Sequence, residues 1–179
     1  MAELLFLHGA MDVPDTPVRR RIEAALGVGW VVTAPELEEP DAATWCDTIA
    51  AALDGLPDDA VVVGHSLGGT MFLKTMAERC PGRALARFVG LACPFFGAGG
   101  WDIPEFTLPP DFAGALHGLG HCRFLQDPRD EIVDISHLSI WARCLPHAIL
   151  TETRGTGHGF ETGDLSPVMA AILGAGGGS

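Results

Sequence analysis

The chain has 179 residues, of which 47% are apolar and 19% are charged, a balance that suits one folded domain with a buried core. Its formal net charge is −12, from 23 acidic against 11 basic residues. A field of that sign repels phosphate backbones and acidic lipid surfaces, so we expect no nucleic-acid partner and no membrane partner. The chain shows no long apolar run and no basic leader, and we expect a cytoplasmic protein.

Short apolar runs of strand length alternate with amphipathic segments of helix length along the chain. The runs cover residues 4–7, 31–34, 61–63, 88–92, 122–125 and 147–150. They are apolar throughout, as expected of parallel strands that are buried on both faces. Strand, helix and strand in alternation predict an α/β fold, a three-layer α/β/α sandwich with about six mostly parallel strands.

The ends of the helices between these strands are marked by capping and stop residues in the sequence. A Thr-Pro pair at 16–17 predicts the start of the first helix, and a glycine at 27 predicts its end. An aspartate at 41 caps a helix predicted over 42–53, and a third helix begins at Ser66 or its successor. A Ser-Pro pair at 166–167 starts a last helix that runs through 173. Three consecutive arginines at 19–21 lie in the first helix, where we expect a solvated face.

We expect a single domain over residues 1–173 and a flexible glycine-rich tail at 174–179. The interval 94–121 breaks the alternation, because prolines and glycines there are interleaved with aromatic residues. It predicts a short cap-like excursion over the ligand edge of the sheet. Two interpretations stay open: the aromatic side chains anchor the loop to the core, or they line a substrate pocket. The candidate pocket residues are Phe95, Phe96, Trp101 and Phe106.

A serine flanked by glycines follows the third predicted strand. The stretch at 64–68 reads Gly-His-Ser-Leu-Gly, directly between a strand and a helix. This pattern predicts a nucleophile elbow, a sharp turn that lifts the hydroxyl of Ser66 to the open edge of the sheet. The flanking residue His65 lies inside the elbow, where we expect its side chain to pack beside the substrate rather than to catalyse.

A serine hydroxyl needs a base within hydrogen-bond reach and an acid that orients the base. His158 lies just past the last strand in a glycine-rich loop, and we expect it to be the base. Two aspartates follow the penultimate strand as candidate acids. Asp130 is the favoured acid, and Asp127 is the alternative, although the proline after it also makes it a natural turn-former. The chain order serine, aspartate, histidine is the order that this class of fold uses.

With these residues in place, the chain resembles the α/β-hydrolase superfamily over essentially its whole length. It is most similar to the small single-domain serine hydrolases of the retinoblastoma-binding-protein and YdeN-like kind, which have a minimal fold without a large lid domain. The segments that carry the resemblance are Leu-His-Gly-Ala at 7–10, Asp-Glu-Ile-Val at 130–133 and Gly-His-Gly-Phe at 157–160. The chain departs from the family pattern at Asp134, where proline is common.

The resemblance implies that the backbone N–H groups of Ala10 and Leu67 form an oxyanion hole, with His8 and Gly9 beside the substrate. It implies a carboxylesterase-like serine hydrolase that acts on a small-molecule ester and needs neither a metal nor an organic cofactor. Thioesterase and amidase activities use the same parts and remain alternatives. So does a non-enzymatic protein-binding module on a hydrolase scaffold. The sequence leaves the oligomeric state open.

Overall fold

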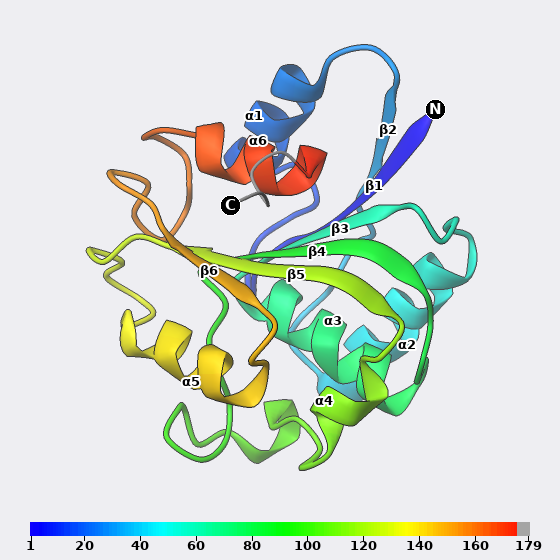
Figure 1. Ribbon diagram of the computed structural model, residues 1–179, viewed down its shortest axis with the longest axis vertical. Coiled ribbons are helices and arrows are strands. Elements are labelled where there is room, and N and C mark those ends of the chain that lie inside the picture. Colours follow the sequence, from blue (N-terminus) through cyan, green and yellow to red (C-terminus); the bar gives the residue numbers. More distant parts are fainter. Residues whose placement is uncertain (175–179) are drawn as a thin grey trace.

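The computed structural model describes residues 1–174 and contains one sheet of six strands in the order β2-β1-β3-β4-β5-β6 (Figure 1). Every neighbouring pair is parallel. The strands are β1 (Ala2–Leu7), β2 (Trp30–Thr33), β3 (Val61–His65), β4 (Leu85–Leu91), β5 (Leu119–Gln126) and β6 (Ile149–Glu152). Because all strands are parallel, their carboxyl ends meet at one edge of the sheet.

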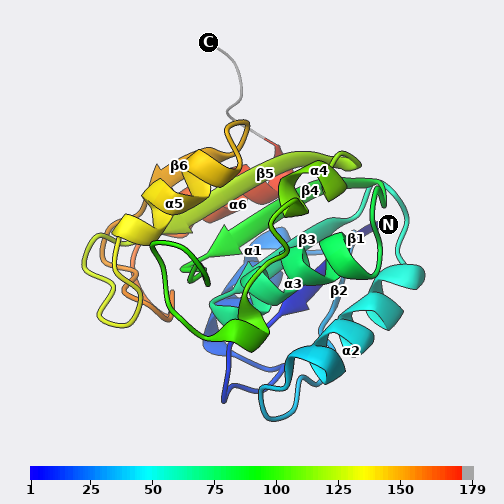
Figure 2. The ribbon, with the colours of Figure 1, turned by 90° about the horizontal axis from the view of Figure 1, so that it is seen from below.

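Helices cover both faces of the sheet (Figures 1 and 2). One face carries α1 (Pro17–Leu26) and α6 (Ser166–Leu173). The other carries α2 (Ala42–Asp54), α3 (Leu67–Glu78), α5 (Ser136–Cys144), the short α4 (Phe112–Ala115) and the 3₁₀ turn η1 (Pro104–Phe106). The predicted three-layer α/β/α sandwich is confirmed.

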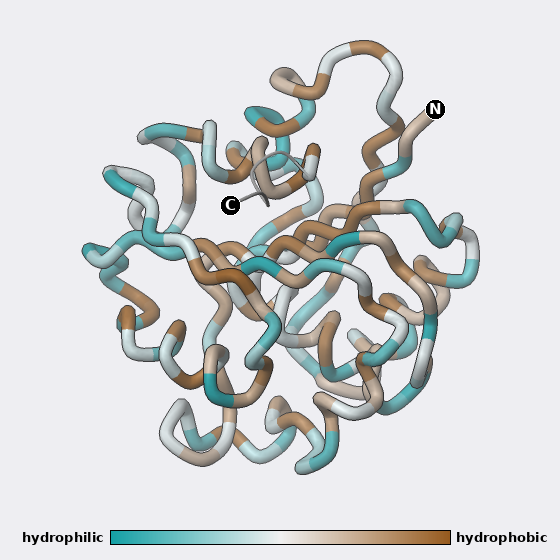
Figure 3. Tube along the Cα trace, viewed as in Figure 1, coloured by the Kyte–Doolittle hydropathy of each residue, from teal (hydrophilic) through white to brown (hydrophobic). Residues whose placement is uncertain are grey.

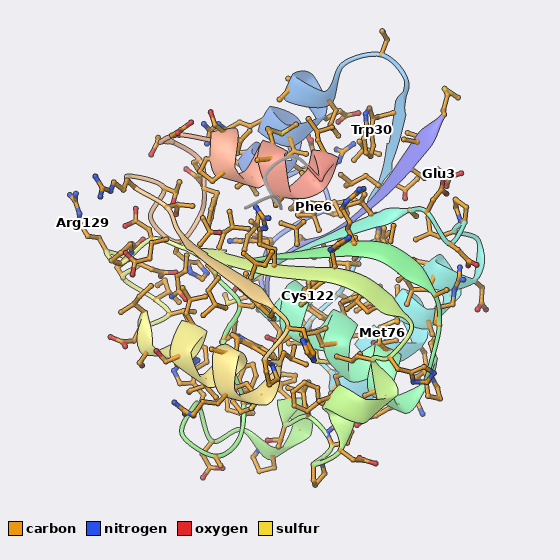
Figure 4. The ribbon with its side chains drawn as sticks, viewed as in Figure 1. Glu3, Phe6, Trp30, Met76, Cys122 and Arg129 are labelled. Carbon is orange, nitrogen blue, oxygen red and sulfur yellow. The ribbon has the colours of Figure 1, made fainter. Side chains whose placement is uncertain are left out.

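The apolar pattern of the strands builds a separate core on each face of the sheet. In β1, Leu5 and Leu7 belong to the cluster under α2 and α3, whereas Leu4 and Phe6 belong to the cluster under α1 and α6. Figure 4 shows Phe6 in this second layer. All five residues of β3 are buried, so the strand that leads into Ser66 is central, and brown apolar stretches run through the middle of the sheet in Figure 3. This packing fixes the position of the turn after β3.

The predicted helix ends are found where the capping residues lie. The hydroxyl of Thr16 accepts a hydrogen bond from the Arg19 amide, and the carboxylate of Asp41 accepts one from the Thr44 amide at 2.8 Å. Gly27 closes α1 with φ 67°, in a region that favours glycine. The last helix likewise covers residues 166–173 as expected.

Strand boundaries differ from the prediction by a few residues. β4 and β5 begin three residues before the apolar runs at 88–92 and 122–125, because backbone pairing such as Arg87 with His121 needs no apolar side chain. β6 begins two residues later than predicted. The outer strands β2 and β6 are only partly buried, as is normal at the edges of a sheet.

The interval 94–121 holds η1, α4 and an isolated bridge between Phe96 and Trp101, and its last residues form the start of β5. It lies on the side of the sheet that carries α3 and α5 (Figure 2). Of the predicted tail at 174–179, only Gly174 is among the described residues. Within residues 1–174, no helix combines the length and hydropathy that crossing a membrane requires.

Candidate active site

Ser66 sits on a strained turn between β3 and α3. Its φ is 52°, a left-handed value that a serine rarely adopts, and its amide donates a hydrogen bond to the Leu91 carbonyl at 2.8 Å. The neighbouring glycines make this turn sterically possible. A Cβ on Gly64 would strike the backbone of Gly69, and one on Gly68 would strike the carbonyl oxygens of Leu7 and His8. The turn therefore has the geometry expected of a nucleophile elbow.

Ser66, His158 and Asp130 form a hydrogen-bonded line at the carboxyl edge of the sheet. His158 Nε2 lies 3.1 Å from Ser66 Oγ, and His158 Nδ1 lies 3.0 Å from Asp130 Oδ2 and 3.1 Å from Oδ1. An ionised carboxylate only accepts, so Nδ1 donates to Asp130 and the bare Nε2 faces the serine hydroxyl. In this tautomer the imidazole can receive a proton from Ser66.

Asp130 is held ionised in this position. Burial of its side chain, which is 0% exposed, raises the carboxyl pKa. Hydrogen bonds from the His158 ring and from the amides of Val133 and Ile132 outweigh burial, so the net pKa lies below the ordinary value. The carboxylate is thus a charged, fixed partner for the imidazole at neutral pH.

The alternative acid, Asp127, has different partners. Its Oδ2 accepts hydrogen bonds from the amides of Thr156 and Gly157 at 2.8 and 3.0 Å, and its Oδ1 accepts one from the amide of Arg129. The Arg129 amide contributes most to lowering the carboxyl pKa of Asp127, against a smaller opposing effect of burial. The structure therefore brings Asp130 to the imidazole, while Asp127 ties the loop after β5 to the loop that carries His158.

Two further side chains fasten the loop that carries His158. His65 Nε2 lies 2.9 Å from the backbone oxygen of His158, and since a carbonyl only accepts, Nε2 is the donor. Arg21 donates to the carbonyl oxygens of Phe160, Thr162 and Gly163. The expectation of a solvated arginine face on α1 is wrong for Arg21, because its guanidinium reaches this loop from the neighbouring helix.

The two predicted oxyanion residues, Ala10 and Leu67, come from different segments that both reach the cavity beside the serine. Leu67 is the first residue of α3, where backbone N–H groups point out of the helix, and Ala10 follows β1. Both line the same cavity as Ser66. Gly9 lies close against the nucleophile, since a Cβ there would be 3.2 Å from the Cβ of Ser66. The loop after β1 and the start of α3 thus flank the space above the hydroxyl.

A cavity of about 500 Å³ opens beside Ser66 and His158. Its aromatic wall is formed by Phe96, Trp101 and Phe106, which pack edge to face at 5.3 to 5.7 Å between ring centroids. The other lining residues are Gly9, Ala10, Met11, Asp12, Pro40, His65, Leu67, Pro94, Ile103 and Ile132. The interval 94–121 therefore supplies the apolar side of the cavity, which is the pocket-forming interpretation.

Two predicted substrate-binding residues do not line this cavity. His8 is fully buried, accepts a hydrogen bond from the Leu37 amide through Nε2 at 3.1 Å, and donates from Nδ1 to the Gly9 carbonyl. Phe95 packs edge to face against Trp141 at 4.9 Å. Its amide donates to His137 Nδ1. His8 thus joins the loops after β1 and β2, and Phe95 anchors the interval 94–121 to the core.

A second cavity of about 610 Å³ lies on the other side of His158 and does not include Ser66. It shares Asp12, His65, Ile132 and His158 with the first cavity. Arg129, Glu131 and Glu161 give it a polar lining, and Figure 4 shows Arg129 projecting outward from the loop after β5. Among residues 1–174, no cluster of three or more histidine, cysteine or carboxylate side chains is placed to hold a metal ion.

The fold and this serine-centred site define a class of protein, the α/β-hydrolases. The chain belongs to the serine hydrolase family, whose model matches residues 4–94, and membership of that family makes the protein a hydrolase. A comparison with curated proteins finds no match.

Solved structures show the same fold over nearly the whole chain. The ydeN gene product of B. subtilis is 20% identical, covers 98% of both chains and superposes with a TM-score of 0.79. An esterase from Rhodococcus is 18% identical, covers 98% of this chain and 91% of its own, and has a TM-score of 0.72. A methylesterase from Arabidopsis is 14% identical, covers 98% of both chains and has a TM-score of 0.67. The expected likeness to small YdeN-like hydrolases is confirmed.

Proposed function

We propose that the protein is a carboxylesterase that works through Ser66, His158 and Asp130. Ser66 Oγ attacks the ester carbonyl while its proton passes to His158 Nε2. The tetrahedral intermediate then collapses, the alcohol leaves with the proton from His158, and an acyl-Ser66 ester remains. Water attacks this ester by the same route, which releases the carboxylic acid and restores the serine. Asp130 keeps the imidazole in the reactive tautomer and stabilises the imidazolium.

The observation that carries this proposal is the hydrogen-bonded line of the three side chains, with 3.1 Å between Ser66 and His158 and 3.0 Å between His158 and Asp130. Each comes after a different strand: Ser66 follows β3, Asp130 follows β5 and His158 follows β6. A purely structural scaffold has no need for a strained serine facing the bare nitrogen of an imidazole. This arrangement favours an enzyme over a binding module.

The oxyanion hole in this mechanism consists of the backbone N–H groups of Ala10 and Leu67. Both residues line the cavity that Ser66 lines, and the start of α3 adds the positive end of its helix dipole. The negative oxygen of the tetrahedral intermediate is stabilised there. Backbone donors of this kind typically contribute about 10²- to 10³-fold to kcat each.

The acyl group of the substrate packs against the aromatic wall formed by Phe96, Trp101 and Phe106. Phe96 and Phe106 are buried, and both line the same cavity as Ser66. Such a wall gains free energy from apolar groups, about 25 cal/mol per Å² of buried surface. We therefore expect apolar acyl groups of short to medium length, and p-nitrophenyl esters are suitable first substrates.

The test compares wild-type protein with Ser66→Ala in fluorophosphonate labelling and in hydrolysis of p-nitrophenyl butyrate. The wild type should gain one adduct on the peptide that contains Ser66, and Ser66→Ala should lose about 10⁴- to 10⁶-fold in kcat. Ser166→Ala, the same exchange at an exposed serine on α6, is the control. Running a thioester and an anilide of the same acyl group beside the ester decides among esterase, thioesterase and amidase. Full activity of a correctly folded Ser66→Ala variant would contradict the proposal.

A further inference from the structure

Three exposed apolar side chains surround the mouth of the cavity beside Ser66. Met11 is 96% exposed, Ile132 is 57% exposed and Ile103 is 41% exposed, and all three belong to the cavity lining. They come from separate segments, after β1, after β5 and within the interval 94–121. We call these three residues the apolar rim. Large apolar side chains gathered around one opening are a common mark of a surface that is covered when a ligand binds.

Met11 is the most unusual member of the apolar rim. Its φ is 62°, in the left-handed region where glycine and asparagine are favoured, and it lies within a turn closed by a hydrogen bond from the Asp12 amide to the Gly9 carbonyl. Folding gains nothing from a long apolar side chain held there in water. Methionine is also flexible and adapts its shape to an apolar partner. Contact with a bound ligand would account for both its exposure and its chemistry.

The apolar rim is continuous with the aromatic wall of the cavity. Ile103 lies between Trp101 and Phe106 in the sequence, and all three line the cavity. A chain that enters along the aromatic wall and continues outward therefore meets apolar surface beyond the enclosed part. By contrast, the cavity on the far side of His158 is lined by charged residues that include Arg129, Glu131 and Glu161. An aliphatic chain therefore makes more favourable contacts with the apolar rim than with the charged lining of the second cavity.

We propose that the apolar rim binds the outer part of an aliphatic acyl chain, so that, within the short-to-medium range, the preferred substrates are esters of medium-chain acids. This inference rests on the esterase function proposed above and specifies its substrate class. Ser66 then attacks a carbonyl whose acyl chain runs along Phe96 and Phe106 and emerges between the rim residues. Each methylene that leaves water contributes about fourfold to kcat/KM, the fold-change that corresponds to the usual transfer free energy of a buried methylene.

The experiment measures kcat/KM for p-nitrophenyl acetate, butyrate, octanoate and decanoate, all below the concentrations at which they form micelles. The wild type should prefer octanoate over acetate. The double variant Met11→Gln, Ile132→Gln replaces two rim residues with polar side chains of similar length. Its octanoate-to-acetate ratio should fall by about fourfold for each methylene that loses its contact. Leu173→Gln, which changes a 53% exposed aliphatic residue on α6, should leave the ratio and the activity on acetate as in the wild type.

Alkyl acetates of increasing alcohol length are measured in parallel. If the rim substitutions changed the preference among the alkyl acetates and not among the p-nitrophenyl esters, the rim would bind the alcohol and the proposal for the acyl chain would be overturned. An unchanged octanoate-to-acetate ratio in the double variant would overturn it as well. Hydrolysis of acetate by the wild type separates both results from a failure of the esterase function itself.

Discussion

His65 connects the segment that carries the nucleophile to the loop that carries the base. It precedes Ser66 in the chain, its side chain is 5% exposed, and it donates a hydrogen bond to the backbone oxygen of His158. We expect His65→Gln, whose amide nitrogen reaches the place of Nε2, to retain most of the activity. His65→Leu should lower kcat by as much as about 100-fold with little change in KM, because the imidazole of His158 would no longer be held in line.

His65→Asn provides the matched control, since its shorter amide reaches the place of Nδ1 and not that of Nε2. The measurement is kcat and KM on p-nitrophenyl acetate, together with far-UV circular dichroism to verify folding. Equal kcat values for the glutamine, asparagine and leucine variants would contradict the positioning role. A loss seen only in KM would contradict it too.

The geometry at single residues explains what the sequence can and cannot reveal. Glycines on both sides of Ser66 are needed for backbone clearance, so the elbow can be read from the sequence alone. The catalytic roles of His158 and Asp130 stay predictions, and the choice of Asp130 over Asp127 depends on which carboxylate faces the imidazole ring and which faces backbone amides. His8 was expected at the substrate, yet it is buried by the loop after β2. No local pattern reports such a contact between distant segments.

At the scale of elements, the loop after β6 is held by a helix from the opposite end of the chain. Arg21 on α1 donates to the carbonyl oxygens of Thr162 and Gly163 at 2.8 Å, and also to Phe160. We expect Arg21→Gln to lower the free energy of unfolding by about 2 kcal/mol, a typical effect for hydrogen bonds from a charged group. It should also lower kcat by about tenfold, because the same loop carries His158.

The neighbouring arginine gives the control for this prediction. Arg20 is 64% exposed and pairs with the exposed Asp15, and surface ion pairs of this kind contribute little to stability because water and salt screen them. Arg20→Gln should therefore leave both quantities nearly unchanged. Urea unfolding and steady-state kinetics on both variants provide the comparison. Equal changes in the free energy of unfolding and in kcat for the two variants would contradict a specific role of Arg21 in holding the loop.

The helices and inner strands were predictable as elements because their signals are local. Thr16 and Asp41 cap their helices through their own side chains, and β3 begins with the apolar run at 61–63. The rim residues and Arg21 were not found, because loop residues have no periodicity and a guanidinium that reaches another loop looks like any solvated charge. The partners of Arg21 are set by the packing of α1 beside α6, which depends on the whole sheet.

At the scale of the whole molecule, two buried histidines should make stability depend on pH. Burial lowers the pKa of the imidazoles of His65 and His137 from the ordinary value of 6.5. Between that value and the lower pKa of the folded state, the unfolded chain binds more protons than the folded one. The free energy of unfolding therefore falls as the pH falls below about 6.5, by at most about 1.4 kcal/mol per pH unit for each histidine.

His137 allows this dependence to be tested without losing its hydrogen bond. Its Nδ1 accepts a hydrogen bond from the Phe95 amide at 2.8 Å, so protonation at Nδ1 would remove the acceptor that anchors the interval 94–121. In His137→Asn, the side-chain oxygen can accept in place of Nδ1 and does not titrate. Urea unfolding at pH 7.5 and pH 5.5 should then show a smaller difference than in the wild type. The same exchange at the exposed His147 controls for the change of residue type. Equal pH dependence in wild type and His137→Asn would show that His137 does not couple proton binding to the anchoring of the cavity wall.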